Sequence, residues 1–223
     1  MAPLTGIDPR TLDRNSVAIL AGLGKVPWFA DFYLAGSAAL ALYLHHRPVR
    51  DLDLMSPVQR LRSIERRDHL QDLLRLDPGF RVETARDGFF YLRSTEGVGL
   101  RFFYYPYPLI DPEAQLDAIS VASPIDLGLM KLGAVISRGT RRDFVDLYLL
   151  ARRVPLADML QRSHEKFGHV RDFPVQALKG LADRSQVGGE PLPDLAEPID
   201  WDDIERWLDD QVSTLGRHQI GLK

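Results

Sequence analysis

The chain has 223 residues, of which 45% are apolar and 26% charged, and its formal net charge is −3. These proportions are those of an ordinary globular protein and exclude disordered, collagen-like and coiled-coil chains. The sequence contains no cysteine, which excludes disulfide frameworks, thiolate metal sites and cysteine nucleophiles. Its length permits one large domain or two small ones.

The sequence gives no indication of export or of a membrane segment. Its first residues lack the basic start and the apolar run of a signal peptide. The longest apolar stretch, residues 34–44, is well short of the roughly 20 residues that a membrane helix requires. We therefore expect a cytoplasmic protein without a membrane partner.

The first half of the chain mixes helical and strand patterns. Its turns are marked by Gly and Pro, most strongly at Asp77-Pro78-Gly79. The predicted elements, in chain order, are a helix over residues 11–23, a strand over 32–35, a helix over 38–45, a strand over 49–55, a helix over 60–76, and strands over 80–85, 89–93 and 98–105.

The second half is predicted to be helical throughout. Two helices are expected within residues 124–153, meeting near Gly139, followed by helices over 156–167, 174–182 and 201–212. Residues 187–200, rich in Gly and Pro, are expected to be a linker. The fold class is therefore α+β, with an α/β domain over residues 1–120 and a helical domain over 121–223.

A Gly-Ser pair followed by an Asp-x-Asp pair is the most informative pattern. Gly36 and Ser37 are expected at a strand-to-helix turn, where the unpaired N–H groups of a helix start suit a phosphate. Asp51 and Asp53 are expected to point the same way from one strand, with backbones about 6 to 7 Å apart. Carboxylates so placed suit ligation of Mg²⁺ together with triphosphate oxygens.

Each half of this pattern also has a purely structural interpretation. A Gly-Ser pair before a helix is most often a turn and an N-cap. Two aspartates on a half-buried face repel each other unless a cation or an arginine neutralises them, and Arg47 or Arg50 could do so. Taken together, the turn, the spacing and the acidic pair favour a metal–nucleotide site.

A second informative segment covers residues 131–150. Lys131 lies in an apolar stretch, so its ammonium must either reach solvent or have an anionic partner. Arg138 lies seven residues later on nearly the same helix face, where the two cations could hold phosphates jointly. Asp143 and Asp146 share a helix face. By pattern alone, these charges indicate a solvated or salt-bridged surface.

These two segments resemble motifs of a known family. The run from Tyr33 to Leu54, with Ala-Gly-Ser before the helix and Arg-Asp-Leu-Asp-Leu on the strand, resembles the nucleotidyltransferase signature of the AbiEii/AbiGii toxin family. The run Lys-Leu-Gly-Ala-Val-Ile-Ser-Arg-Gly-Thr-Arg-Arg-Asp-Phe-Val-Asp-Leu-Tyr resembles that family's second pair of motifs. The resemblance covers about residues 30–153, with both motifs in the right order.

The resemblance implies a polymerase-β-like nucleotidyltransferase fold with an attached helical domain. It also implies Mg²⁺-dependent transfer of a nucleotide from an NTP to an acceptor hydroxyl, such as a tRNA 3′ end, and a cognate antitoxin encoded nearby. The site residues that it implies are Gly36 and Ser37 for the β- and γ-phosphates, Asp51 and Asp53 for the metal ions, Lys131 with Arg138 for the nucleotide phosphates, and Asp146, or less favourably Asp143, as the late acidic residue.

Two positions depart from the family pattern. Val49 stands where the family has a serine, and Arg101 stands on the later strand where such enzymes commonly place a third carboxylate. That carboxylate usually acts as a general base or completes the metal shell. Two alternatives therefore stay open: a degenerate fold that binds a nucleotide or a partner without catalysis, and a small-molecule nucleotidyltransferase of the aminoglycoside type.

The net charge of −3 averages two unlike parts. Residues 187–210 carry nine acids against one base, a net charge of −8, which leaves +5 on the rest of the chain. Nine arginines are predicted to form a basic surface compatible with RNA contact. They are Arg60, Arg62, Arg66, Arg67, Arg138, Arg141, Arg142, Arg152 and Arg153.

Overall fold

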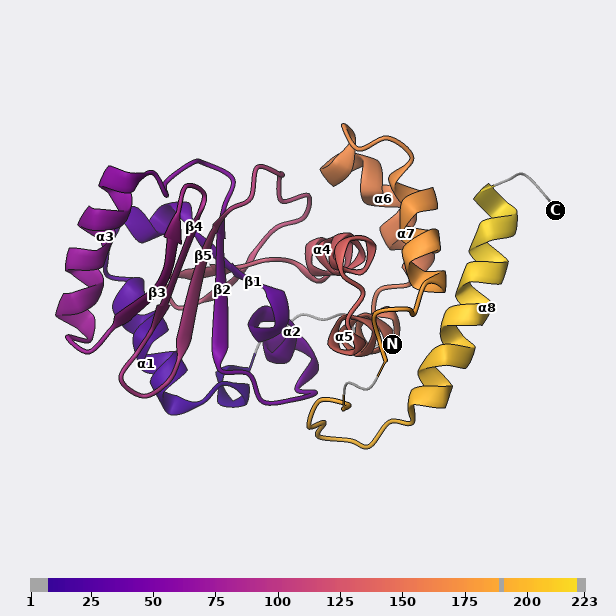
Figure 1. The fold of residues 1–223 in the computed structure, drawn as a ribbon, viewed down its shortest axis with the longest axis horizontal. Coiled ribbons are helices and arrows are strands. Elements are labelled where there is room, and N and C mark those ends of the chain that lie inside the picture. Colours follow the sequence, from indigo (N-terminus) through magenta and orange to yellow (C-terminus); the bar gives the residue numbers. More distant parts are fainter. Residues whose placement is uncertain (1–7, 189–190, 220–223) are drawn as a thin grey trace. The chain divides into compact units, whose positions relative to one another are not determined.

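The computed structural model describes residues 8–188 and 191–219, which form two compact units divided between Ser123 and Pro124 (Figure 1). The first unit contains a sheet with helices packed against it. The described residues of the second unit are helices and loops. The predicted α+β class is confirmed.

The sheet has seven strands in the order β3-β4-β5-β2-β1-β7-β6. At its centre, β2 pairs antiparallel with β1 and parallel with β5, and β1 pairs parallel with β7. The strands are β1 Tyr33–Ala35, β2 Asp51–Ser56, β3 Arg81–Arg86, β4 Phe89–Arg93, β5 Gly99–Tyr104, β6 Ala114–Leu116 and β7 Ile119–Val121.

The two faces of the sheet differ in burial because side chains alternate along each strand. On β2, Leu52 and Leu54 are fully buried, whereas Asp51 and Asp53 on the other face are half-buried. The buried face continues into an aromatic cluster in which Trp28 stacks on His69, with 3.8 Å between ring centroids, and Phe102 of β5 lies nearby. The core of this unit therefore lies on the face opposite the two aspartates.

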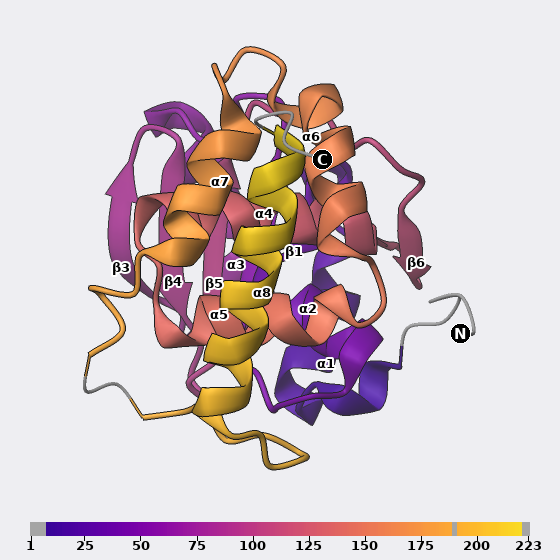
Figure 2. The ribbon, with the colours of Figure 1, turned by 90° about the vertical axis from the view of Figure 1, so that its right-hand side faces the viewer.

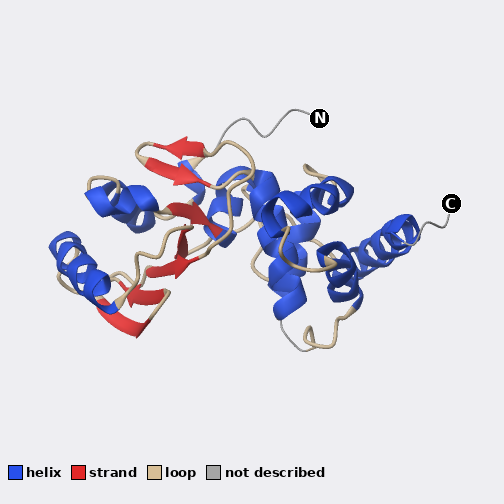
Figure 3. Ribbon diagram, turned by 90° about the horizontal axis from the view of Figure 1, so that it is seen from above, coloured by secondary structure: helices blue, strands red, loops and turns tan. Residues whose placement is uncertain are grey.

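Helices cover this sheet as a separate layer when the unit is seen from above (Figure 3). Asp13 caps the first long helix by accepting hydrogen bonds from two backbone N–H groups, as expected of an N-cap aspartate. The helical segments of the unit are η1 Pro9–Thr11, α1 Arg14–Leu23, η2 Pro27–Asp31, α2 Gly36–Leu44 and α3 Ser63–Leu76.

The sequence analysis assigned no strand to residues 113–123, and the structure places the β6–β7 hairpin there. Asp117 turns this hairpin with φ of 53°, a conformation that aspartate tolerates better than most residues. Each strand has three residues, too few to show an alternating pattern. Pairing with β1 at the centre of the sheet stabilises β7, and this non-local pairing leaves no local signal.

The helical unit contains α4 Pro124–Ser137, α5 Arg141–Ala151, α6 Leu156–Phe167, α7 Phe173–Ala182 and α8 Trp201–Gln219. The break between α4 and α5 falls at Gly139, which has φ of +52°, as predicted. The last helix is longer than predicted, because it continues through the polar residues that follow Val212.

Within the helical unit, α8 lies against α5 and α7 (Figure 2). Trp201 packs edge-on against Phe144, and Trp207 packs edge-on against Tyr148, at centroid distances of 6.2 and 5.3 Å. The two tryptophans therefore hold α8 against α5. Among the described residues, no helix combines the length and apolar character needed to span a membrane.

Candidate nucleotide site

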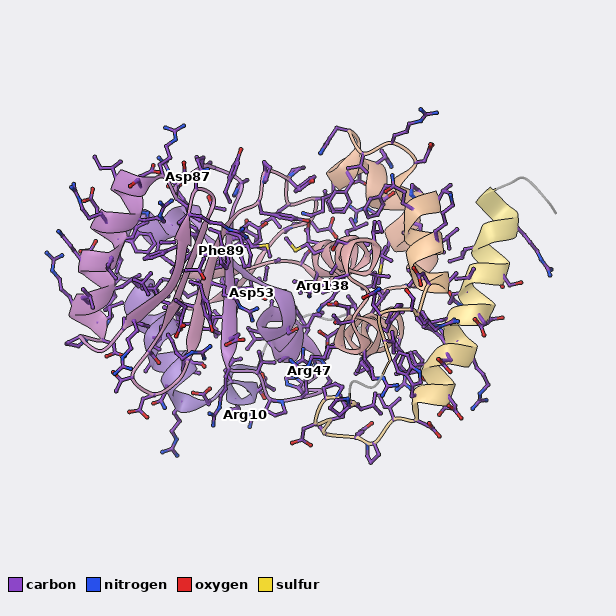
Figure 4. The ribbon with its side chains drawn as sticks, in the orientation of Figure 1. Arg10, Arg47, Asp53, Asp87, Phe89 and Arg138 are labelled. Atoms are coloured by element: carbon purple, nitrogen blue, oxygen red, sulfur yellow. The ribbon has the colours of Figure 1, made fainter. Side chains whose placement is uncertain are left out.

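The predicted acidic pair lies on the half-buried face of the sheet. Asp51 and Asp53 begin β2, and their side chains are 39% and 17% exposed. Asp53 stands opposite Ala35, the last residue of β1, in the antiparallel register. The strand end that leads into the Gly-Ser turn therefore lies directly beside the second aspartate. Figure 4 labels Asp53 on the sheet.

Gly36 is required at this position for two reasons. Its φ of +61° lies in the left-handed region, which other residues adopt only at a cost. A Cβ atom built on Gly36 would also overlap the carboxylate of Asp53. Helix α2 begins at this residue, with Ser37 next in its first turn. The structure thus brings together the helix start and the acidic pair that the sequence pattern linked.

Arg101 joins both aspartates. In the parallel register of β2 and β5, Arg101 lies opposite Asp53. Its Nη2 donates a hydrogen bond to Oδ2 of Asp51 at 2.8 Å, and its Nε lies 3.1 Å from Oδ1 of Asp53. Arg101 on β5 therefore supplies a positive charge to the acidic pair. The sequence pattern suggested Arg47 or Arg50 for this role, and singled out Arg101 only as a departure from the family pattern.

Gly99 is a further position beside the acidic pair, one that no sequence pattern indicated. It lies opposite Asp51, and a Cβ atom there would overlap Oδ1 of that aspartate. Gly99 and Arg101 are two residues apart, as Asp51 and Asp53 are. Aligning the two predicted strands in parallel would have placed each opposite one aspartate, but the sequence does not state which strands are neighbours.

A divalent cation fits this pair only together with other ligands. Mg²⁺ is usually held by one or two carboxylates, with substrate phosphates and water completing its shell, and Asp51 with Asp53 can supply the carboxylates. Within residues 8–188 and 191–219, no three or more His, Asp or Glu side chains are grouped so as to hold a metal ion. The pair therefore suits a cation that arrives with a triphosphate.

The residues of the second motif form a cluster inside the helical unit. The Nζ atom of Lys131 on α4 lies 3.1 Å from Oδ1 of Asp143 and 2.8 Å from Oδ2 of Asp146, both on α5. Arg138 binds Asp143 through Nε at 2.8 Å and Nη2 at 2.9 Å. Thr140 donates its hydroxyl hydrogen to the same carboxylate at 2.7 Å and caps α5.

This cluster is buried, so its charges depend on one another. The side chains of Lys131, Asp143 and Asp146 are 8%, 1% and 0% exposed. Burial favours the neutral amine, but Asp146 and Asp143 outweigh it and raise the pKa of Lys131. Burial likewise opposes the charged form of Asp143, but hydrogen bonds from Arg138 and Thr140, with the charge of Lys131, hold its pKa well below the usual range.

The predicted site residues thus form two groups, each within its own unit. Gly36, Ser37, Asp51 and Asp53 lie together in the sheet unit, and the group of Lys131 lies in the helical unit, with Arg138 at the end of α4 (Figure 4). The pattern left a solvated or a salt-bridged surface open for the second group. Its aspartates are salt-bridged and buried.

The arginines predicted to form a basic surface also divide between the units. In the sheet unit, Arg60 pairs with Asp31 at 2.7 Å and Arg66 with Asp87 at 2.9 Å. In the helical unit, Arg141 lies over the ring of Trp201. Several of these cations therefore have partners within the chain, and contact with RNA stays a prediction.

Comparison with known proteins identifies a family and a relative that the chain resembles. A family model described as the nucleotidyl transferase AbiEii toxin of type IV toxin–antitoxin systems matches residues 18–211. An uncharacterised protein of Aquifex aeolicus (strain VF5) is 29% identical over 187 residues, which cover 82% of this chain and 86% of that protein.

Among solved structures, a candidate nucleotidyltransferase from H. pylori has a similar fold. Its TM-score is 0.54 at 17% identity, over 94% of this chain and 96% of that one. The predicted polymerase-β-like nucleotidyltransferase fold is therefore confirmed, with a mixed seven-stranded sheet at its centre. By the family match over most of its length, the chain belongs to the AbiEii family of nucleotidyl transferase toxins.

Proposed function

We propose that the protein transfers a nucleotide from a magnesium-bound NTP to an acceptor hydroxyl. The acceptor oxygen would form a bond to the α-phosphorus while the bond from that phosphorus to the oxygen bridging to the β-phosphate breaks. Pyrophosphate would leave with the bridging oxygen, and the acceptor hydroxyl would give up its proton to solvent. Asp51 and Asp53 would hold Mg²⁺, which supplies charge neutralisation for the triphosphate. Catalysis of this kind depends mainly on positioning and on electrostatic stabilisation.

The observation that carries this proposal is the packing of Gly36 against Asp53. A Cβ atom at residue 36 would overlap the Asp53 carboxylate, so the first N–H groups of α2 and the acidic pair lie at one place. The N–H groups of a helix start attract phosphate, and the carboxylates attract the cation that accompanies it. A turn that served only to reverse the chain would have no need of this neighbour.

The roles predicted for Lys131, Arg138 and Asp146 form a second, separable part of the proposal. Phosphate contact by Lys131 requires its ammonium to exchange one of its carboxylate partners for the ligand, because it binds both Asp143 and Asp146. Loss of activity on replacing Lys131 would therefore not distinguish a catalytic role from a role in folding. The test must use a variant in the sheet unit.

The test uses Asp51→Ala with each of the four NTPs, labelled at the α-phosphate, and total RNA as acceptor. We expect wild-type protein to label RNA and Asp51→Ala to lose transfer by about 100-fold or more, the scale of losing a main electrostatic contact in a transition state. Asp51 is 39% exposed and lies on the face away from the core, so the variant should fold.

Asp68→Ala is the matched control. Asp68 is an exposed aspartate on α3 of the same unit, and its side chain is 62% exposed. It should retain full transfer. Undiminished labelling by Asp51→Ala, with folding of both variants confirmed by circular dichroism, would contradict the proposal.

We propose a tRNA 3′ end as the acceptor and a cognate antitoxin, encoded nearby, as the protein partner. Membership of a family of type IV toxin–antitoxin systems supports the antitoxin partner, and the tRNA terminus is the acceptor that the resemblance to this family implies. Fractionating the labelled RNA by size and digesting it from the 3′ end would identify the acceptor. Label in internal positions or in non-tRNA species would exclude a tRNA terminus.

One observation favours a second candidate function, a nucleotide-binding protein without catalysis. Arg101 takes the place on β5 where a third carboxylate is expected, and it engages both aspartates. Calorimetry of NTP binding with and without Mg²⁺ separates the two functions. Metal-independent binding, without transfer to any RNA, would favour the binding protein.

A further inference from the structure

Arg101 holds a place that sheet geometry fixes. β5 lies between β2 and β4, so Arg101 has Asp53 on one side and Tyr91 on the other. All three side chains project from the half-buried face. The guanidinium therefore reaches the acidic pair across a parallel register that cannot slip by one residue without turning Phe102 out of the core.

The contacts of Arg101 occupy one oxygen of each aspartate. Its Nη2 binds Oδ2 of Asp51, and its Nε lies beside Oδ1 of Asp53. The two remaining carboxylate oxygens lie against backbone: Oδ1 of Asp51 against Gly99 and Oδ2 of Asp53 against Gly36. A cation shared between the carboxylates would need the oxygens that the guanidinium holds.

The burial of this group permits such an exchange. The side chains of Arg101 and Asp51 are 33% and 39% exposed, so their ion pair is partly solvated and costs less to break than a buried one. The contact of Arg101 Nε with Oδ1 of Asp53 is buried, and a cation that replaced the guanidinium there would have to supply the same charge. Guanidinium binds phosphate oxygens as readily as carboxylates, often with two hydrogen bonds. When a divalent cation binds the carboxylate oxygens that Arg101 contacts, a triphosphate at the Gly36 turn would therefore offer its phosphate oxygens to Arg101 as new hydrogen-bond acceptors.

We propose that Arg101 is a positioning residue that occupies the cation's place on Asp51 and Asp53 until a metal-bound triphosphate displaces it. Because Arg101 competes with the cation for the same carboxylate oxygens, free metal binds weakly. Binding of the metal is therefore coupled to binding of the nucleotide. The part that concerns the nucleotide rests on the function proposed above. The competition between Arg101 and a divalent cation does not.

The first arm of the test measures binding of Mn²⁺ alone by electron paramagnetic resonance. We expect Arg101→Ala to bind one Mn²⁺ about tenfold more tightly than wild type, because removing a neighbouring unit charge and a competing donor changes affinity on this scale. Arg101→Gln keeps much of the side-chain length without the charge, so it should show the same increase in Mn²⁺ affinity. It replaces Arg101→Ala in the test if that variant folds poorly.

Arg93→Ala is the matched control, since it removes an equal charge from the same face. Arg93 lies on β4 opposite Gly99, and its own contacts are to Tyr91, the Gly97 carbonyl and Glu83. Its loss should change the Mn²⁺ affinity less than twofold. The double variant Asp51→Ala/Arg101→Ala should lose the increase in Mn²⁺ affinity that Arg101→Ala shows, because tight Mn²⁺ binding needs both carboxylates.

The second arm adds an α,β-methylene NTP analogue, which binds without transfer. The analogue should raise the Mn²⁺ affinity of wild type more than that of Arg101→Ala, since only wild type has a competitor to displace. An unchanged or weaker Mn²⁺ affinity in Arg101→Ala would overturn the competition, and equal gains in the two proteins would overturn the coupling. Absence of RNA labelling by wild type would instead refute the proposed transfer and leave the first arm standing.

Discussion

Two clusters in this chain each centre on two aspartates bound by one basic side chain, but they differ in burial. In the sheet unit, Asp51, Asp53 and Arg101 keep side-chain exposures of 39%, 17% and 33%. In the helical unit, Lys131 and its two aspartates are at most 8% exposed. The first cluster can exchange its internal partners for a ligand, whereas the second has no water to replace a lost partner.

The difference follows from the elements that hold each cluster. A sheet with one covered face leaves alternate residues of β2 and β5 accessible, and the glycines at 36 and 99 leave space around the carboxylates. Facing helices α4 and α5 enclose the other cluster. Charges in such an interior persist only when every member is paired. The greater exposure of the Asp51, Asp53 and Arg101 cluster therefore suits it to ligand exchange, whereas the buried Lys131 cluster suits a structural role.

Replacing Lys131 should break the buried cluster with the largest effect on stability. Lys131→Ala leaves Asp143 and Asp146 without the ammonium that binds both, and removing one partner of a buried ion pair costs about 3–5 kcal/mol. Asp51→Ala, by contrast, should cost less than about 1 kcal/mol, because its pair is partly solvated. Denaturant unfolding followed by circular dichroism measures both.

Lys179→Ala serves as the control for this prediction. Lys179 is exposed on α7, so its loss should change the unfolding free energy by no more than about 0.5 kcal/mol. If Lys131→Ala were as stable as this control, the cluster would not stabilise the helical unit, and a ligand-binding role for Lys131 would gain support.

Gly36→Ala tests the open cluster through its backbone. We expect a loss of about 2 kcal/mol, since the left-handed conformation alone costs roughly 1–2 kcal/mol and the new methyl group overlaps the Asp53 carboxylate. Nucleotide transfer should be lost as well, because Asp53 must move. Thermal unfolding and RNA labelling give the two readouts.

Gly216→Ala is the matched control, because a Cβ atom there meets nothing within 4 Å inside α8. It should raise the stability by up to about 1 kcal/mol, the usual gain of Ala over Gly in a helix. Full transfer activity in Gly36→Ala would show that the turn does not position the aspartate pair.

Most of the fold could be predicted because its signals are local. The Gly-Ser turn, the Asp-x-Asp strand and the amphipathic helices each show a pattern within a dozen residues. Their ends lie within about three residues of the predicted ones, except that α8 continues beyond Val212. The β6–β7 hairpin could not be predicted, since β7 depends on pairing with β1, whose partner residues lie 87 positions earlier in the chain.

For the candidate site, the sequence predicted which residues lie together in each unit but not which side chains they contact. The acidic pair and its neighbouring glycine follow from spacing, whereas the bond from Arg101 to Asp51 spans 50 positions and depends on which strands are neighbours. Similarly, the sequence placed Lys131 in an apolar stretch, where its ammonium had either to reach solvent or to have an anionic partner. Only the packing of α5 on α4 decides that Asp143 and Asp146 supply that anion.

The smallest of the predicted effects concerns acid stability of the buried cluster. The folded pKa of Asp143 lies below its usual value, so the unfolded chain binds more protons and the unfolding free energy falls as the pH drops below about 3.9. Arg138→Met removes two hydrogen bonds from this carboxylate. The pKa of Asp143 should therefore rise toward its ordinary value, and the loss of stability between about pH 4 and pH 2 should become shallower.

At neutral pH, Arg138→Met should cost only about 1 kcal/mol, because the Arg138 side chain is 60% exposed and solvent screens its charge. Arg142→Met, an exposed arginine on α5, controls for the loss of one positive charge and should leave the acid profile unchanged. Urea midpoints measured across this pH range give the comparison. Identical profiles for Arg138→Met and wild type would mean that Lys131 and Thr140 suffice to hold Asp143 ionised, and that Arg138 could exchange this carboxylate for a ligand at little cost.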